Sequence, residues 1–136
     1  MSLPEFRIKL TLEASLAPSE DPTKVNAAIG NVLGDSVYSL EEGKRSLRAT
    51  SVDPRSIRRL HDQLRDRHVR GAAKRLLASG REGDRATVML NRQAALSGVL
   101  AMCGSEAESP LGPLYLTIES KDMDAVLQWL TAYEPG

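Results

Sequence analysis

Apolar and polar residues alternate strictly near the start of the chain. Between positions 6 and 14 the apolar side of this pattern consists of Phe6, Ile8, Leu10, Leu12 and Ala14. A period of two predicts a β-strand that buries one face. Comparable stretches predict further strands at 36–40, 46–52, 85–90, 99–103 and 114–118. The first two of these are joined by "EEGK", a turn in which glycine adopts positive φ at little cost.

Helix signals lie between these strands. Asp21 before Pro22, and again Asp53 before Pro54, place a side-chain acceptor ahead of a proline, which is typical of a helix start. The first helix has an apolar stripe of Val25, Ala28, Ile29 and Val32 and ends at Gly34. A last helix is expected from Lys121 to about Tyr133, capped by Ser120. Its inward stripe consists of Met123, Val126, Leu127, Leu130 and Tyr133.

The segment after Pro54 carries two apolar stripes that do not coincide. The first consists of Ile57, Leu60 and Leu64, and the second of Val69, Ala72, Ala73, Leu76 and Leu77. At ~100° per residue they lie about 150° apart around the axis, so one straight helix cannot bury both against a sheet. We therefore predict two helices with a break between Arg65 and His68.

The resulting order, β-α-β-β-α-α-β-β-β-α, predicts an α+β protein. Strands joined by short turns pair antiparallel, so we expect a mostly antiparallel sheet with helices packed on one face. A chain of 136 residues is long enough for one core, and we predict a single domain over residues 1–136.

Composition excludes several classes of protein. No apolar run approaches the ~18 residues of a membrane span, and the N-terminus lacks the pattern of a signal peptide. The lone Cys103 cannot form an internal disulfide or a cysteine-based zinc cluster. We expect a cytoplasmic protein with no membrane association and no cofactor.

Charge is distributed unevenly along a chain whose formal net charge is zero. The segment 44–85 holds thirteen Lys and Arg against five Asp and Glu, a balance of +8, so the remainder carries −8. Such asymmetry indicates an anionic partner for the basic segment. Arginine dominates it, and the planar guanidinium suits bidentate phosphate contacts.

The predicted phosphate contacts lie on the two middle helices, opposite their apolar stripes. These candidates are Arg55, Arg58, Arg59, Arg65, Arg67, Arg70 and Lys74. The alternative is a solvated helix surface, with Arg58–Asp62 and Asp66–Arg70 as four-apart ion pairs worth a few tenths of a kcal/mol each. Two acids cannot neutralise so many cations, which favours the nucleic-acid interpretation.

Two further strings, "LNRQAALSG" and "ESPLGPLYLTI", together with "DPTKVNAAIGNVL", resemble an uncharacterised archaeal protein family described as RNA-binding. The shared pattern covers nearly the whole chain. The resemblance implies RNA binding and a fold like that of the fifth large-subunit ribosomal protein, an α+β sandwich. Arg92 and Ser97 depart mildly from the family pattern, and Gly71 weakens the second middle helix by about 1 kcal/mol relative to alanine.

The two strings themselves allow two interpretations. Asn91, Arg92 and Gln93 are a candidate rim of the RNA interface, but Asn and Gln at a strand end more often satisfy local backbone groups. In "ESPLGP", Pro110 and Pro113 fix φ, and Gly112 permits a left-handed turn. We expect this loop to lead rigidly into an inner strand, and the structural interpretation of both strings is favoured.

No catalytic machinery is evident, so we expect no enzyme. His61 and His68 are seven positions apart across the predicted break, which argues against a shared metal site, and each is expected at a surface or a cap. Cys103 is expected to be buried. Phosphate-cradling and nucleophile motifs are absent, although a pair of carboxylates brought together in space would leave no trace in the sequence.

The aromatic residues all lie outside the basic segment, which argues against base stacking. We therefore expect recognition of structured RNA by shape and phosphate contacts. The alternative function is a protein-interaction or self-association (scaffold) module, in which basic helices meet an acidic protein surface. A homo-oligomer or a ribonucleoprotein assembly is compatible with either.

Overall fold

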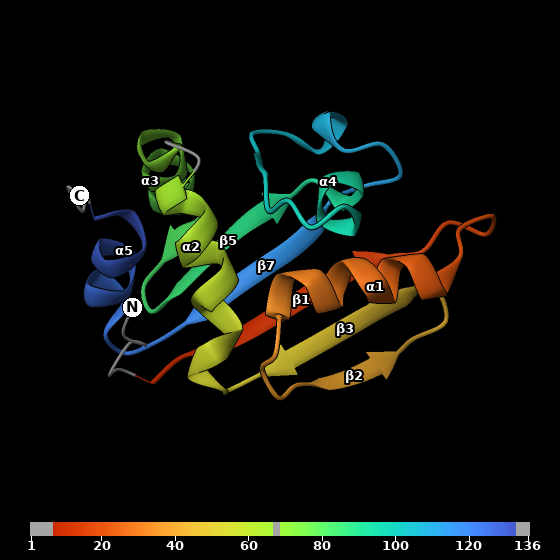
Figure 1. The fold of residues 1–136 in the computed structure, drawn as a ribbon, viewed down its shortest axis with the longest axis horizontal. Coiled ribbons are helices and arrows are strands. Elements are labelled where there is room, and N and C mark those ends of the chain that lie inside the picture. Colours follow the sequence, from red (N-terminus) through yellow and green to blue (C-terminus); the bar gives the residue numbers. More distant parts are fainter. Residues whose placement is uncertain (1–6, 67–68, 133–136) are drawn as a thin grey trace.

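One antiparallel sheet forms the centre of the computed structural model, which describes residues 7–66 and 69–132 (Figure 1). Its seven described strands follow the order β2-β3-β1-β7-β5-β4, with β6 also pairing with β5. Their bounds are β1 Lys9–Ser15, β2 Ser39–Glu42, β3 Ser46–Ser51, β4 Arg81–Glu82, β5 Arg85–Leu90, β6 Met102–Cys103 and β7 Leu114–Glu119. The predicted α+β class and antiparallel sheet are confirmed.

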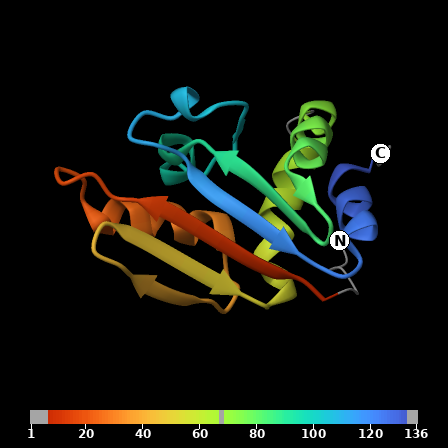
Figure 2. The same ribbon diagram turned by 180° about the vertical axis from the view of Figure 1, so that it is seen from behind.

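The helices cover one face of this sheet, and the opposite face is bare when the molecule is turned around (Figure 2). Their bounds are α1 Pro22–Leu33, α2 Arg58–Asp66, α3 Arg70–Ser79, α4 Arg92–Leu96 and α5 Met123–Thr131, with short 3₁₀ turns η1 Pro54–Ile57 and η2 Glu106–Glu108. The helix-covered face holds the core because the long strands β1, β3, β5 and β7 alternate buried and accessible residues.

Register aligns the buried residues of neighbouring strands. Leu12 of β1 lies opposite Ala49 of β3 and Leu116 of β7, and Leu116 in turn lies opposite Val88 of β5. The α1 stripe predicted from the sequence is buried above them. Burying one leucine or valine side chain contributes about 1.5–3 kcal/mol, so this layer supplies the main stabilisation of the fold.

The bare face is polar. Threonines form a row across four strands, in the register order Thr50, Thr11, Thr117 and Thr87. Flanking ion pairs join Arg48 to Glu13 at 3.0 Å and Arg85 to Glu119 at 3.2 Å. An antiparallel sheet with one packed face and one such polar face needs no second layer.

Both predicted Asp-Pro helix starts are confirmed. The Asp21 carboxylate accepts a hydrogen bond from the Thr23 amide at 2.9 Å, and Asp53 accepts from the Arg55 amide at 3.0 Å. The predicted break is confirmed too, because α2 ends at Asp66 and α3 begins at Arg70. His68, on the far side of that break, lies outside the described residues.

Some predicted boundaries were wrong. The strand placed at 99–103 shortens to β6 because the Leu100 amide donates to the Gln63 side chain rather than to a neighbouring strand. The strand placed at 36–40 begins at Ser39 because the Val37 amide donates to Asp53. Of the predicted stripe at α3, the N-cap residue Val69 and Ala72 are exposed, whereas Ala73 and Leu77 are buried.

The last helix also starts later than predicted. α5 begins at Met123 rather than Lys121, and its N-cap residue is Asp122. Ser120 accepts from the Asp122 amide at 3.1 Å and donates to the Arg7 carbonyl at 2.7 Å, so its hydroxyl fastens the preceding turn to the start of β1. Tyr133 lies outside the described residues.

Candidate nucleic-acid interface

Asp53 anchors the first basic helix and one of its arginines. Its carboxylate accepts from the Val37 amide at 2.8 Å and lies 2.8 Å from Nη2 of Arg55. Hydrogen bonds from the Arg55 side chain, with those from the Val37 and Arg55 amides, hold the pKa of Asp53 well below its usual range. The same pair raises the pKa of Arg55. Arg55 is half exposed but already paired, so its charge is partly neutralised.

Arg58, Arg59 and Lys74 are exposed to solvent. The stem of Arg59 lies against the backbone at Gly34, where an added Cβ would be 3.0 Å from its Cδ. Its guanidinium reaches the Gly98 carbonyl at 3.5 Å. The buried residues Ile57, Leu60 and Leu64 occupy the opposite side of this helix, as the sequence pattern predicts.

The remaining helix candidates lie around the break between α2 and α3. Arg70 donates to the Arg65 carbonyl at 3.2 Å, which brings its guanidinium to the C-terminal end of α2. Arg67 lies outside the described residues. Arg75, which was not among the predicted contacts, is exposed on α3 and adds a further cation to this surface.

The predicted rim at 91–93 does not form one exposed surface. Asn91 caps α4, its Oδ1 accepting from the Ala94 amide at 2.9 Å, while its Nδ2 donates to the Glu108 carbonyl at 3.1 Å. Gln93 is exposed, but Arg92 is 5% exposed. A phosphate therefore cannot reach Arg92 in this conformation, and the structural interpretation holds for Asn91 and Arg92.

Arg92 instead forms a buried ion pair. Its Nη1 lies 2.5 Å from a carboxylate oxygen of Glu20, and its Nη2 donates to the Pro113 carbonyl at 3.1 Å. The Arg92 amide donates to the Ser109 hydroxyl at 3.0 Å. These contacts fasten α4 to the "ESPLGP" loop, and Gly112 has the left-handed conformation that the sequence predicts, with φ at 94°.

His61 lies in the core, not at the surface or a cap as predicted. It is 3% exposed, and its ring stacks on Trp129 of α5 with the ring centroids 4.0 Å apart. The helix periodicity places His61 beside the apolar stripe of α2, and stacking on Trp129 buries its ring. The described residues contain no group of three metal-ligating side chains.

Cys103 is buried as predicted. Burial, with a smaller effect of the nearby Glu108 charge, raises the pKa of its thiol. A thiol with a raised pKa is a poor nucleophile at neutral pH.

None of the helices in the described part of the chain has the length and hydropathy of a membrane span.

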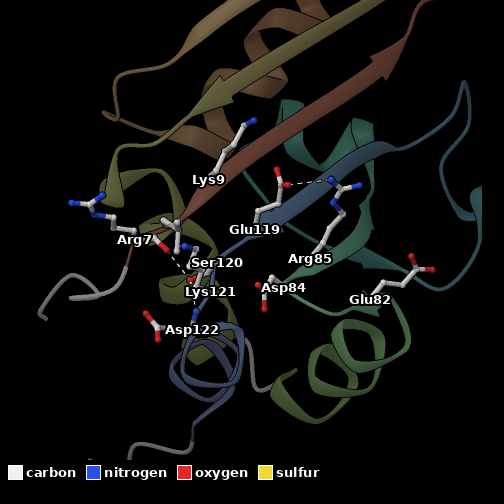
Figure 3. Close-up of a pocket in the computed structure, with 10 residues that line it drawn as sticks. Arg7, Lys9, Glu82, Asp84, Arg85, Glu119, Ser120, Lys121 and Asp122 are labelled. Atoms are coloured by element: carbon white, nitrogen blue, oxygen red, sulfur yellow. Dashed lines mark hydrogen bonds and ion pairs between the residues drawn. The ribbon is translucent and has the colours of Figure 1, made fainter.

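A pocket of about 880 Å³ opens where the end of β7 meets the start of β1 and the β4–β5 hairpin (Figure 3). Its polar lining mixes both signs: Arg7, Lys9, Arg85, Lys121, Glu82, Asp84, Glu119 and Asp122. Figure 3 shows Arg85 directed toward Glu119 and Ser120 bonded to the backbone of Arg7. With four cations and four anions in its lining, the pocket offers no preference for an anionic ligand.

Comparison with known proteins finds archaeal relatives that align over most of the chain. No family model matches the chain. A UPF0201 protein of Metallosphaera sedula is 38% identical over 123 residues, which cover 90% of this chain and 86% of the relative. A UPF0201 protein of Sulfolobus acidocaldarius is 40% identical over 125 residues, with the same coverage.

Solved structures share the fold. The crystal structure of an uncharacterised UPF0201 protein superposes with a TM-score of 0.77 at 22% identity, covering 94% of this chain and 97% of the other. That of a UPF0201 protein from Methanococcus jannaschii gives a TM-score of 0.76 at 19% identity, covering 94% and 96%.

Proposed function

The chain belongs to the UPF0201 family of archaeal proteins, and we propose that it binds structured RNA through the basic face of α2 and α3. One observation carries the proposal: α2 and α3 expose cations to solvent, among them Arg58, Arg59, Lys74 and Arg75. The described members of this basic face are Arg55, Arg58, Arg59, Arg65, Arg70, Lys74 and Arg75.

The geometry favours phosphate contacts over base reading. Arginine on a helix surface supplies affinity that does not depend on sequence. One face of the Trp129 ring is covered by His61, which disfavours its stacking on a base. The predicted likeness to the fifth large-subunit ribosomal protein is compatible with this mode and stays a prediction.

A variant pair tests the proposal at fixed salt. Arg58, Arg59 and Lys74 are replaced together by glutamine, and a control variant carries glutamine at Lys44, Arg45 and Lys121, which are exposed but lie outside α2 and α3. Both variants lose three positive charges. Binding is measured by fluorescence anisotropy with a labelled RNA hairpin of about two helical turns in 100 mM salt.

We expect the helix variant to bind RNA at least about tenfold more weakly than the parent, because fewer phosphate contacts release fewer counterions on binding. The control variant should bind within about threefold of the parent. Equal losses of affinity in the two variants would show that binding depends on net charge and not on the basic face. No loss of affinity in the helix variant would refute the proposed interface. Circular dichroism establishes that each variant is folded.

A further inference from the structure

Three sequence motifs meet at a second pocket, whose lining includes no residue of the proposed basic face. The start of α1 contributes positions between 19 and 28, α4 contributes Arg92, Gln93 and Leu96, and the "ESPLGP" loop contributes Pro110 and Leu111. The pocket has a volume of about 320 Å³. Ligand pockets commonly measure about 300–1,000 Å³, so this one suits an inserted side chain better than a large cofactor.

The lining of the pocket combines apolar residues with ionic groups whose formal charges balance. Val25, Ala28 and Leu96 are among its apolar lining residues. The ionic groups are two acids, Glu20 and Asp21, and two cations, Lys24 and Arg92. Arg92 and Glu20 already neutralise each other below the surface. A neutral apolar group is therefore a better occupant than an ion.

Leu111 stands at the rim of this pocket in an unusual backbone conformation. Its φ is 69°, which makes it the sole non-glycine residue with positive φ in the described part of the chain. Its side chain is 58% exposed. The Ser109 hydroxyl, which accepts from the Arg92 amide, donates to the Gly112 carbonyl at 3.0 Å and holds the loop in place. Because these bonds hold the loop backbone in place, binding at Leu111 costs little backbone entropy.

We propose that this surface is a homodimer interface in which Leu111 of each copy inserts into the pocket of the other. A two-fold interface uses one patch twice, so the patch must contain both the inserted group and the site that receives it. Here the exposed Leu111 and the pocket occupy the same patch. A protein of zero net charge has no overall self-repulsion to overcome.

Charge at the rim is also self-complementary. Asp21 and Lys24 are exposed one helical turn apart, and neither forms an ion pair among the residues described. A two-fold axis through the patch allows Asp21 of one copy to face the partner's Lys24, and the reverse. This interface differs from the predicted self-association through basic helices, and it does not depend on RNA binding.

Sedimentation equilibrium of the full chain from about 1 to 200 μM tests the dimer. We expect a monomer–dimer equilibrium in the parent and at least about tenfold weaker association for Leu111→Asp and for Leu111→Gly. The glycine variant should also show a higher denaturation midpoint, because glycine adopts positive φ without strain. It therefore separates loss of the interface from loss of the fold.

Val52→Asp is the matched control, since Val52 is an exposed apolar residue at the end of β3, away from the pocket. It should leave the dimer unchanged. A monomeric parent over the whole range would overturn the proposal, as would a dimer that persists unaltered in both Leu111 variants. Loss of the dimer with retained hairpin binding would leave the RNA proposal standing, because the two surfaces share no residue.

Discussion

The buried ion pair of Arg92 and Glu20 links three parts of the chain at one point. The two side chains are only 6% and 7% exposed. Removing one member of a buried pair leaves the other charge without compensation, which is far more costly than the pair's net contribution to stability. The pair is therefore a structural element whose loss should be readily measured.

Arg92→Met should lower the free energy of unfolding by about 3–5 kcal/mol, because Glu20 would remain buried without its partner. Gln93→Ala, at the exposed neighbouring position, should change it by no more than about 0.5 kcal/mol. Urea denaturation followed by circular dichroism measures both. An Arg92→Met variant within 1 kcal/mol of the parent would show that the ion pair is dispensable.

Asp53 should make stability depend on pH. Its pKa is lowered in the folded protein, so its contribution is complete above the unfolded carboxylate pKa of about 3.9 and is lost as the pH falls toward the lowered folded value. Asp53→Asn keeps a capping oxygen but loses the charge that pairs with Arg55, so it should destabilise the protein by up to about 1 kcal/mol at pH 7 and flatten the decline below pH 4. Denaturation between pH 2.5 and 7 measures this. The prediction would be contradicted if the free energies of unfolding of parent and variant declined equally as the pH falls.

Individual side-chain environments were the least predictable feature. Glu20 is 72 positions from Arg92, and no local pattern indicates that they meet. The burial of His61 likewise requires Trp129, which belongs to a helix at the other end of the chain. The Asn91 cap, by contrast, rests on a contact only three positions away, and its structural role was favoured from the sequence.

Elements with a clear period or a strong start signal were predictable. The alternation in β5 gave its bounds, Arg85–Leu90, and the Asp-Pro pairs gave the starts of two helices. The five-residue α4 was not foreseen because it is too short to show a helical period. β4 was missed for the same reason, since its two residues are defined by pairing with β5.

Two glycines in and after α3 should respond in opposite ways to alanine. At Gly80 an added Cβ would lie 1.9 Å from the Thr87 carbonyl oxygen, so Gly80→Ala should destabilise the protein by roughly 2–3 kcal/mol. At Gly71 the nearest such contact is 3.9 Å, and Gly71→Ala should stabilise it by up to about 1 kcal/mol through helix propensity. Thermal denaturation measures both effects. A shift of the melting temperature in the same direction for both variants would contradict this packing.

At the scale of the whole molecule, the two proposed binding surfaces lie on different elements. The helices and the bare polar sheet face opposite directions (Figures 1 and 2). The basic face lies on α2 and α3, and the Leu111 pocket lies between α1, α4 and the "ESPLGP" loop. The charge asymmetry was visible in the sequence, whereas the pocket was not, because its lining comes from three distant segments.

The salt dependence of RNA binding tests the central claim most directly. If about six phosphate contacts form on a hairpin duplex, log K should fall with log salt at a slope of roughly −5. The variant with glutamine at Arg58, Arg59 and Lys74 should fold normally and flatten this slope by about three units, and single-base changes in the hairpin should matter little. A folded variant that kept the parent's slope and affinity would contradict the assignment of RNA binding to α2 and α3.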